Sequence, residues 1–237
     1  MKQTILNLSI AAVLLQPMIY INDVNAEKGD FVVRVRATNI SPDEDSDLYD
    51  ETQKSTGLAS TLYGANSGAE LSVESNTIPE IDFSYYWTKN FATELILAIG
   101  SRHDVSVVGS SGNIEKDLGS VNLLPPTLTG QWHFRPDQSF DPYIGAGISY
   151  VRAMDNRLED HVNNLSIRID RNRLAPVLQI GADINLESNW MVNVDLKKFW
   201  YNTDVETKGA ATSYNWVKID DLDVDPWVSS IGVGYRF

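Results

Sequence analysis

Histidine, serine and carboxylate side chains are the residues of this sequence that could carry acid–base, nucleophilic or metal chemistry. The three histidines, His103, His133 and His161, are far apart and fall near different connections between strand-like segments. Histidines that bind a metal usually recur at short, fixed spacings, and these do not. Ser101, His103 and Asp104 are neighbours, but geometry defines a catalytic triad, not proximity in sequence. We therefore predict no catalytic residue, no metal ligand and no cofactor, and we expect His103 at the surface.

A second group of ionisable residues alternates with apolar residues inside segments that resemble β-strands. Arg34 and Arg36, for example, alternate with Val33 and Val35. Such alternation places one set of side chains on each face of a strand. Charges that are buried in proteins usually persist because they are paired. We therefore predict an interior charge network that stabilises the fold, formed by Arg34, Arg36, Asp82, Glu94, Asp183, Asp195 and Arg236, with Lys197 on the same face.

Eight such segments make up most of the chain, and no helical period of any length is evident. They run over residues 30–40, 69–87, 91–104, 120–134, 142–154, 174–185, 190–203 and 216–237. Short polar connections at 88–90, 135–141 and 186–189 alternate with long ones at 41–68, 105–119, 155–173 and 204–215. This rhythm is typical of outer-membrane barrels. We predict an all-β fold, an eight-stranded antiparallel up-and-down transmembrane β-barrel with short periplasmic turns, long extracellular loops and both termini in the periplasm.

The direction of the apolar face separates a membrane barrel from a soluble one. A soluble eight-stranded barrel such as a lipocalin points its apolar face inward, and alternation alone fits both classes. Aromatic residues favour the membrane barrel, because they gather beside the short turns, where a membrane interface would lie. These residues are Trp87, Phe91, Phe134, Tyr143 and Trp190. The final strand, from Trp227 to Phe237, has aromatic residues at both ends of its apolar face, like a strand that crosses a bilayer.

Composition and the first residues of the chain indicate a secreted protein. Residues 1–26 have a short basic start, an apolar run and a small-residue end, so we expect a removed signal peptide, followed by one barrel domain over 27–237. The absence of cysteine excludes a scaffold stapled by disulfides. The net charge of −13 argues against nucleic acid as a partner. Two acidic runs, Pro42 to Asp50 and Lys218 to Asp225, are expected to be loops at a solvated rim.

Several short motifs, taken in their order along the chain, resemble the OmpW family of outer-membrane proteins. The resemblance is carried by Arg34, Glu94-Leu95, Leu124-Pro125-Pro126-Thr127-Leu128, Pro142 to Gly147, Gln179 to Asp183, Asp225-Pro226-Trp227 and Gly232 to Phe237. It implies a narrow, partly hydrophobic lumen with a constriction at Ile96 and Lys197, where Lys197 replaces an aromatic residue of the family. The ending of the chain, with Tyr235 and Phe237, resembles the insertion signal that the barrel-assembly machinery reads.

The resemblance also implies a function, which is the passage of small, mainly hydrophobic molecules across the bacterial outer membrane. The expected partners are outer-membrane lipid, small apolar solutes and the barrel-assembly machinery. A second function stays open, because an eight-stranded barrel is barely wide enough for its own side chains. The alternative is a plugged structural or adhesive barrel whose extracellular loops bind other surfaces. Interlocked interior charges would favour the plug, whereas an apolar waist containing Ile96 and Ala98 would favour the passage.

Overall fold

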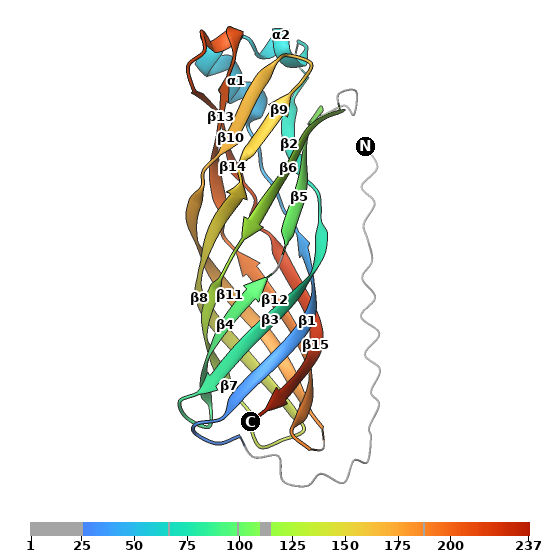
Figure 1. Ribbon diagram of the computed structural model, residues 1–237, viewed down its shortest axis with the longest axis vertical. Helices are drawn as coiled ribbons and strands as arrows, with labels where there is room; N and C mark the ends of the chain where they lie inside the picture. The colour runs from blue at the N-terminus through green and yellow to red at the C-terminus, as the bar shows by residue number, and fades with distance from the viewer. Residues whose placement is uncertain (1–25, 66, 99, 110–114, 187) are drawn as a thin grey trace.

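A computed structural model describes residues 26–237 except 66, 99, 110–114 and 187, so the expected signal peptide at 1–26 falls outside the described residues but for its last position. The protein is a tall barrel of tilted strands (Figure 1). Its lower part is a closed ring of eight antiparallel strands, as predicted. In ring order these are β1 (Phe31–Ser41), β3 (Asn76–Tyr86), β4 (Phe91–Ala98), β7 (Thr127–His133), β8 (Phe140–Asp155), β11 (Asn172–Asn185), β12 (Trp190–Phe199) and β15 (Trp227–Arg236).

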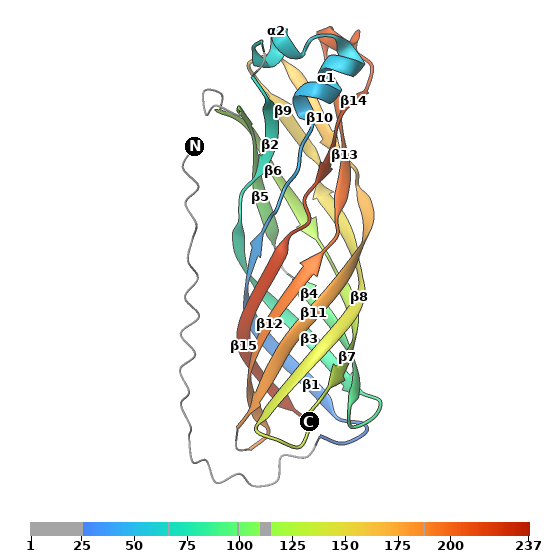
Figure 2. The ribbon, with the colours of Figure 1, turned by 180° about the vertical axis from the view of Figure 1, so that it is seen from behind.

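Above this ring, at the end opposite the short turns, lies a second storey that we call the crown. Its strands are β2 (Ala69–Val73), β5 (Ser101–Gly109), β6 (Glu115–Leu124), β9 (Arg157–Asp160), β10 (Leu165–Ile169), β13 (Asn202–Lys208) and β14 (Val217–Asp223). Helices α1 (Leu48–Thr56) and α2 (Ala59–Tyr63) and the 3-10 helix η1 (Ala210–Thr212) lie at its top (Figure 2). Within the described ranges, no helix combines the length and the hydropathy needed to cross a bilayer.

The crown corrects three expectations from the sequence. Strands occupy much of the described part of the predicted loops 105–119, 155–173 and 204–215. The expectation of a chain without helices is wrong, because α1 and α2 lie in the first long connection. The acidic run that begins at Lys218 is mostly strand β14. The outward residues of β14 are charged, so its composition resembles that of a loop. Ile219 and Leu222, however, are buried on its inner face.

The ring and the crown have opposite polarity. Ring residues such as Leu128, Ile180 and Ile231 point outward and are exposed over 53, 57 and 58% of their surface. In the crown, by contrast, apolar residues such as Val107 and Ile167 are buried inside. The ring therefore has the pattern of a membrane barrel and the crown has that of a water-soluble one, so each of the two classes weighed from the sequence describes one storey.

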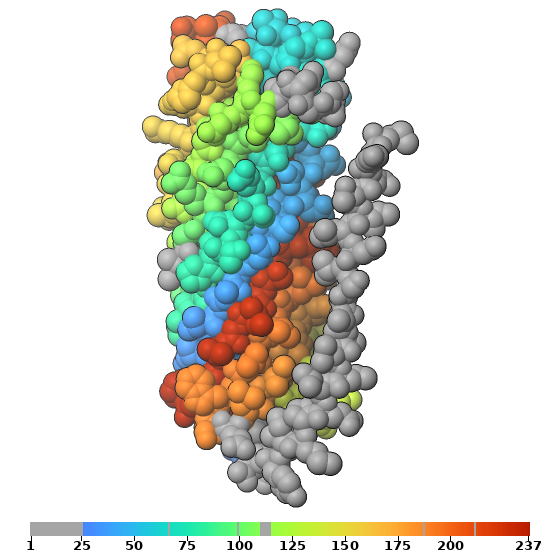
Figure 3. All heavy atoms as spheres, turned by 90° about the vertical axis from the view of Figure 1, so that its right-hand side faces the viewer, coloured from blue at the N-terminus to red at the C-terminus, as the bar shows by residue number. Residues whose placement is uncertain are grey.

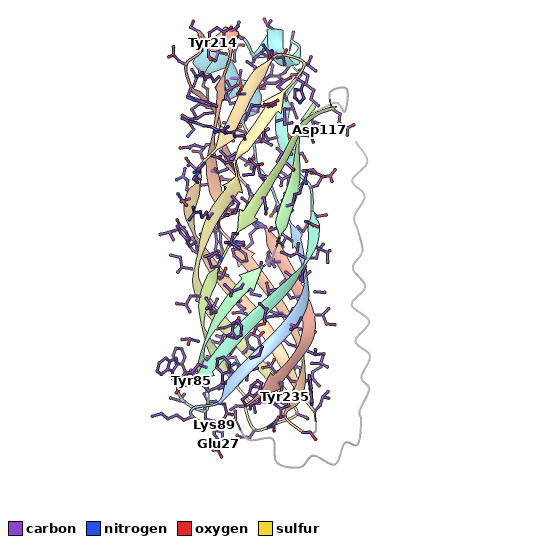
Figure 4. The ribbon with its side chains drawn as sticks, viewed as in Figure 1. Glu27, Tyr85, Lys89, Asp117, Tyr214 and Tyr235 are labelled. Atoms are coloured by element: carbon purple, nitrogen blue, oxygen red, sulfur yellow. The ribbon has the colours of Figure 1, made fainter. Side chains whose placement is uncertain are left out.

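Aromatic side chains surround the ring near the short turns. Tyr85 and Tyr235 lie at this end together with Glu27 and Lys89, whereas Tyr214 and Asp117 mark the crown (Figure 4). Four of the five predicted interface aromatics, Trp87, Phe91, Phe134 and Trp190, are outward and exposed. The prediction for Tyr143 is wrong, because this side chain is inside the ring and only 2% exposed. Its neighbour Ile144 points outward, and strand alternation therefore turns Tyr143 inward.

The first and last strands of the ring lie side by side, as the blue and red strips on the face in Figure 3 show. Their register places Arg34 opposite Gly234 and Arg36 opposite Gly232. A Cβ atom at Gly232 would lie 2.1 Å from the carbonyl oxygen of Val35, and one at Gly234 would lie 2.7 Å from the Cγ atom of Arg34. These two glycines therefore leave the space in which the arginines enter the interior.

Candidate functional site

The interior of the ring is filled by charged side chains that come from different strands. Arg34 of β1 binds the carboxylate of Asp183 on β11 through Nε (3.3 Å) and Nη2 (2.7 Å), and its Nη1 atom donates to Asp82 on β3 at 3.1 Å. Arg36, two residues further along β1, donates from Nε to Asp82 at 2.7 Å and from Nη2 to Glu94 on β4 at 2.5 Å. All five side chains are buried, and these pairs link β1 to its neighbour β3 and, through the lumen, to the more distant strands β4 and β11.

Amide and hydroxyl groups extend this network across the rest of the lumen. Glu94 accepts hydrogen bonds from the Nε2 atoms of Gln131 on β7 (2.9 Å) and Gln179 on β11 (2.8 Å). Asp195 on β12 accepts from Gln179, from the hydroxyl of Tyr143 and from Nζ of Lys197, at 2.7, 2.7 and 2.5 Å. Seven of the eight ring strands, all but β15, thus contribute side chains to one interlocked layer. We call this layer the floor, and its members are Arg34, Arg36, Glu80, Asp82, Glu94, Gln131, Tyr143, Gln179, Asp183, Asn193, Asp195 and Lys197.

The structure therefore brings together most residues of the predicted charge network. Arg34, Arg36, Asp82, Glu94, Asp183 and Asp195 are in direct contact, and Lys197 joins them. Arg236 lies apart, with its Nε atom 3.6 Å from Asp30 and its guanidinium over the ring of Tyr86. Floor residues that the sequence reasoning missed are Glu80, Gln131, Tyr143, Gln179 and Asn193.

A histidine–carboxylate cluster lies in the ring below the floor, where the sequence predicted no metal ligand. Ligand atoms of His133, Asp141 and Asp183 lie within 4.8 Å of one another, and all three side chains are buried. Each of them already has a strong partner, because Nδ1 of His133 is 2.7 Å from Asp141 and Asp183 is bound by Arg34. Among the described residues, this cluster has the ligand atoms and spacing that could hold a metal cation. The contacts just given already satisfy its side chains without a metal. His133 is missed because alternation gives the face of a strand but not the partners on other strands.

An apolar chamber lies directly above the floor, where the ring passes into the crown. Its volume is about 100 Å³. For comparison, an apolar protein cavity of about 150 Å³ stays dry and binds benzene. Apolar side chains from strands all around the barrel form its wall, among them Ile78, Ile96, Leu123, Val151, Phe199, Tyr201 and Leu222. Its base consists of polar side chains, which are Glu80, Lys197, Thr38 and Thr127.

The two residues predicted to form a constriction, Ile96 and Lys197, both border this chamber. Ile96 is 3% exposed and Lys197 is 1% exposed. Lys197 also belongs to the floor, because its Nζ atom is bound to Asp195. They lie at the boundary between the apolar chamber and the charged floor, and their role in limiting a passage stays a prediction.

The wall of the chamber has a gap in its hydrogen-bonded ladder beside β4 and β5. The β4–β7 ladder ends at the pair Ile96–Thr127, and the β5–β6 ladder begins at Ser101–Leu123. Between these pairs, Pro125 and Pro126 have no N–H group to offer, so they cannot donate across the gap. Chamber-lining residues on both sides of the gap are Ala98, Ser101, Leu123 and Pro125. The apolar chamber therefore borders a stretch of wall where the ladders of β4 and β5 with their neighbours β7 and β6 do not meet.

Ser101 and His103 lie at the upper edge of this gap. Nε2 of His103 is 2.8 Å from the Ser101 hydroxyl, and Nδ1 is 2.9 Å from the carbonyl oxygen of Glu74. A carbonyl only accepts, so Nδ1 carries the proton and Nε2 accepts from Ser101. Burial lowers the pKa of His103, which favours this neutral form. The expectation of a surface histidine is wrong, because His103 is 4% exposed, whereas Asp104 points outward and completes no triad.

An eight-stranded ring with an apolar outer surface and a charged interior defines the protein as a bacterial outer-membrane β-barrel. A model of the OmpW family matches residues 27–237, and the chain belongs to this family. It is 30% identical to outer membrane protein W of Escherichia coli over 97% of this chain and 99% of the relative. It is 26% identical to the dibenzothiophene metabolism operon protein PahQ of Pseudomonas aeruginosa over 90% of each chain. Among solved structures, OprG of Pseudomonas aeruginosa superposes with a TM-score of 0.74 at 27% identity, covering 91% of this chain and 99% of that one.

Proposed function

We propose that this protein is a passive conduit for small, mainly hydrophobic molecules across the outer membrane, and that they leave the barrel sideways. The observation that supports this best is the position of the apolar chamber, which is bounded below by the charged floor and borders the ladder gap at its side. An apolar solute would gain about 25 cal/mol for each Å² of surface that the chamber removes from water. The same solute would be opposed by the polar floor.

The proposal also includes an orientation of the barrel in the membrane. The crown has charged outward residues and an apolar inside, and it would stand in water, whereas the ring would lie in lipid. Outer-membrane barrels place their short turns in the periplasm and their long connections outside the cell. The proposal therefore places the crown outside the cell and both termini in the periplasm. It takes the outer-membrane lipid and the barrel-assembly machinery as partners, with Tyr235 and Phe237 in the insertion signal.

The ladder gap supports a lateral exit. On the far side of β4, its ladder with β3 ends at Glu80–Ala98, and the ladder of β5 with β2 begins only at Val73–Val105. Gly100, between β4 and β5, thus has no ladder partner among the described residues on either side. Above it, the β5 backbone is held to residues 74–76 by two hydrogen bonds, from the N–H of Glu74 to the carbonyl of Asp104 (3.0 Å) and from the side-chain amide of Asn76 to the carbonyl of Arg102 (2.6 Å). A local separation there would break few hydrogen bonds, and it would open the chamber at the height where the outward apolar surface of the ring ends.

The names of the relatives agree with an apolar cargo. PahQ is named for an operon of dibenzothiophene metabolism, and dibenzothiophene is an apolar, fused aromatic compound. The Escherichia coli relative is named as an outer membrane protein, which agrees with a conduit.

The second candidate is the plugged structural or adhesive barrel, and the interlocked floor is the observation that favours it. The two candidates make different predictions for transport, since a plugged barrel would carry no solute by any route. The conduit would carry apolar solutes and exclude sugars of similar size.

Transport in asymmetric vesicles with lipopolysaccharide in the outer leaflet tests the proposal. We expect the protein to accelerate the uptake of naphthalene but not of arabinose. Replacing both Pro125 and Pro126 by alanine restores two backbone donors at the gap, and it should slow naphthalene uptake several-fold. Pro176→Ala is the matched control, because Pro176 lies within the continuous β8–β11 ladder. Equal naphthalene uptake by vesicles with and without the protein would favour the plugged barrel.

A further inference from the structure

One buried carboxylate oxygen at the base of the chamber has no hydrogen-bond donor. Glu80 ends the β3–β4 ladder, borders the chamber and is 4% exposed. Its Oε1 atom lies 3.1 Å from Nε of Arg36 and 3.8 Å from Nζ of Lys197, yet it makes no hydrogen bond to any described residue. The nearby donors are directed elsewhere, because Nε of Arg36 donates to Asp82 and Nζ of Lys197 donates to Asp195.

The other polar side chains around the chamber are satisfied. Within the described part of the lining, each of them takes part in at least one hydrogen bond to another protein group, the residues being Thr38, Ser101, His103, Thr127, Lys197, Tyr201 and Thr203. The Oε1 atom of Glu80 has two cations nearby but accepts no hydrogen bond from them. A buried acceptor without a hydrogen bond is costly, and such groups in native proteins often receive a ligand or water. Glu80 is therefore the place in this apolar chamber where a donor from a guest molecule would be stabilised.

The charge around Glu80 sets a second condition on the guest. The contacting ionic groups of the floor comprise three cations, Arg34, Arg36 and Lys197, and five carboxylates, Glu80, Asp82, Glu94, Asp183 and Asp195. Formal negative charge thus exceeds positive charge next to the chamber. A further carboxylate in an apolar cavity would be desolvated and also repelled by this floor.

We infer that the chamber selects neutral apolar molecules that carry one hydrogen-bond donor, with the donor bound to Glu80, and that it excludes apolar carboxylates. This inference rests on the proposed conduit function and names the class of molecule that it takes. A short alcohol or a phenol has the required chemistry. The hydroxyl donates to Glu80 at the base, and the apolar part contacts Ile78, Ile96 and the other wall residues.

Equilibrium binding to the protein in lipid nanodiscs tests the inference with toluene, benzyl alcohol and benzoate, which share one ring and differ in their polar group. The readout is the methyl NMR signals of Ile78 and Ile96, and empty nanodiscs correct for partition into lipid. A hydrogen bond to a charged acceptor is worth about tenfold in affinity or more. We expect benzyl alcohol to bind about tenfold more tightly than toluene, and benzoate to cause no saturable shift.

Variants of Glu80 connect the preference to this side chain. Glu80→Gln removes the charge but keeps an acceptor, so the preference for benzyl alcohol should fall several-fold and benzoate should become measurable. Glu80→Asp withdraws the carboxylate by one methylene and should reduce the alcohol preference while benzoate stays excluded. Glu70→Gln is the matched control, because Glu70 is exposed on β2 and does not line the chamber. Heat-modifiable migration on gels shows that each variant is folded.

The outcomes separate this inference from the function on which it rests. If none of the three probes shifts the chamber methyls of the wild-type protein, the conduit proposal itself is wrong. If toluene and benzyl alcohol bind equally, or if benzoate binds as well as the alcohol, the conduit survives and the selection by Glu80 is wrong. An unchanged ratio in folded Glu80→Gln would also show that Glu80 does not select the guest. The wild-type series decides the question even if the Glu80 variants do not fold.

Discussion

At the scale of single residues, glycine determines whether long cations fit inside so narrow a ring. Arg34 and Arg36 each extend into the lumen, and the positions facing them across the β1–β15 ladder are Gly234 and Gly232. Met191 packs against the same space, since a Cβ at Gly234 would lie 3.0 Å from its Cγ atom. The space left by these glycines is thus part of the charge network.

Alanine at these two positions should destabilise the barrel to different extents. At Gly232 the added Cβ meets backbone, the carbonyl oxygen of Val35, whereas at Gly234 it meets the side chains of Arg34 and Met191. Side chains can shift more cheaply, so we expect Gly234→Ala to cost roughly 1–3 kcal/mol and Gly232→Ala to cost more. Urea unfolding followed by heat-modifiable migration measures both. Ser229→Ala, on the outward face of the same strand, is the control, and a cost for Gly232→Ala no larger than for Ser229→Ala would contradict this account.

Much of the floor could be predicted from the sequence, and what could not has a physical explanation. Period-two alternation places Arg34, Asp82 and Asp195 inside because it fixes the face of each strand. It does not fix the height of a residue on the barrel or its neighbours on other strands. The bond from Tyr143 to Asp195 and the position of Glu80 beneath an apolar chamber depend on strand tilt and register, which no local pattern contains.

At the scale of elements, helix α1 depends on a carboxylate from strand β14. Asp47 at the helix N-terminus provides no capping side chain, and the backbone N–H of Asp47 instead donates to Asp220 at 3.0 Å. The hydroxyl of Ser46 and the N–H of Asp221 donate to the same carboxylate. Leu48 then buries its side chain in the apolar cluster of the crown. Asp220 thus connects the helix that covers the crown to the wall beneath it.

Burial raises the pKa of Asp220 above its ordinary value of 3.8 despite these hydrogen bonds. A carboxyl group with a raised pKa in the folded state binds its proton more tightly there than when unfolded. Its contribution to stability is therefore greatest at acid pH and is lost as pH rises through the raised pKa. We expect the amides of α1, such as that of Glu51, to exchange with solvent more readily above this pKa than below it, after correction for intrinsic exchange rates.

Variants of Asp220 should separate its charge from its role as an acceptor. Asp220→Asn keeps an acceptor for the helix terminus and should leave α1 protected while removing this pH dependence. Asp220→Ala loses the acceptor, and the loss of a cap costs about 1 kcal/mol, so protection should fall about fivefold. Asp221→Asn, on the exposed side of β14, is the control. Equal protection in the alanine and asparagine variants would show that Asp220 does not anchor the helix.

The elements of the ring were easier to predict than those of the crown. The ring strands alternate cleanly, and tight turns such as 88–90 bound them, so eight strands could be placed from the sequence. The crown strands reverse the polarity and carry many charges on their outward faces, as Lys218 and Asp221 do. Segments with that composition resemble loops when read alone. Their inward residues, such as Val205 and Ile219, can be recognised as core residues only once the barrel that surrounds them is known.

At the scale of the whole molecule, the reversal of polarity divides one continuous barrel into a membrane part and a water-exposed part. The boundary lies where the charged floor meets the apolar chamber, with Lys197 and Glu80 bordering both. From the ring to the crown, the interior changes from charged to apolar. At a similar level the exterior changes from apolar to charged. A solute in the chamber would therefore be separated from the lower lumen by charges, and it would lie at the level where the outer surface of the barrel changes from apolar to charged.

This arrangement predicts that the protein is closed to ions as long as the floor is intact. Gln131 and Gln179 approach Glu94 from β7 and β11, and their amides fill the middle of the lumen. We expect wild-type protein in planar bilayers at about 1 M KCl, where the Debye length is only about 3 Å, to show no stepwise conductance. The double variant Gln131→Ala/Gln179→Ala should show small conductance steps, because water would enter the space left by the two amides. The steps should be cation-selective, because the carboxylates of the floor outnumber its basic side chains. Gln138→Ala, in the turn between β7 and β8, is the control and should stay silent. Steps of similar size in the wild-type protein would mean that the floor does not seal the lumen, and a sideways exit would no longer be required.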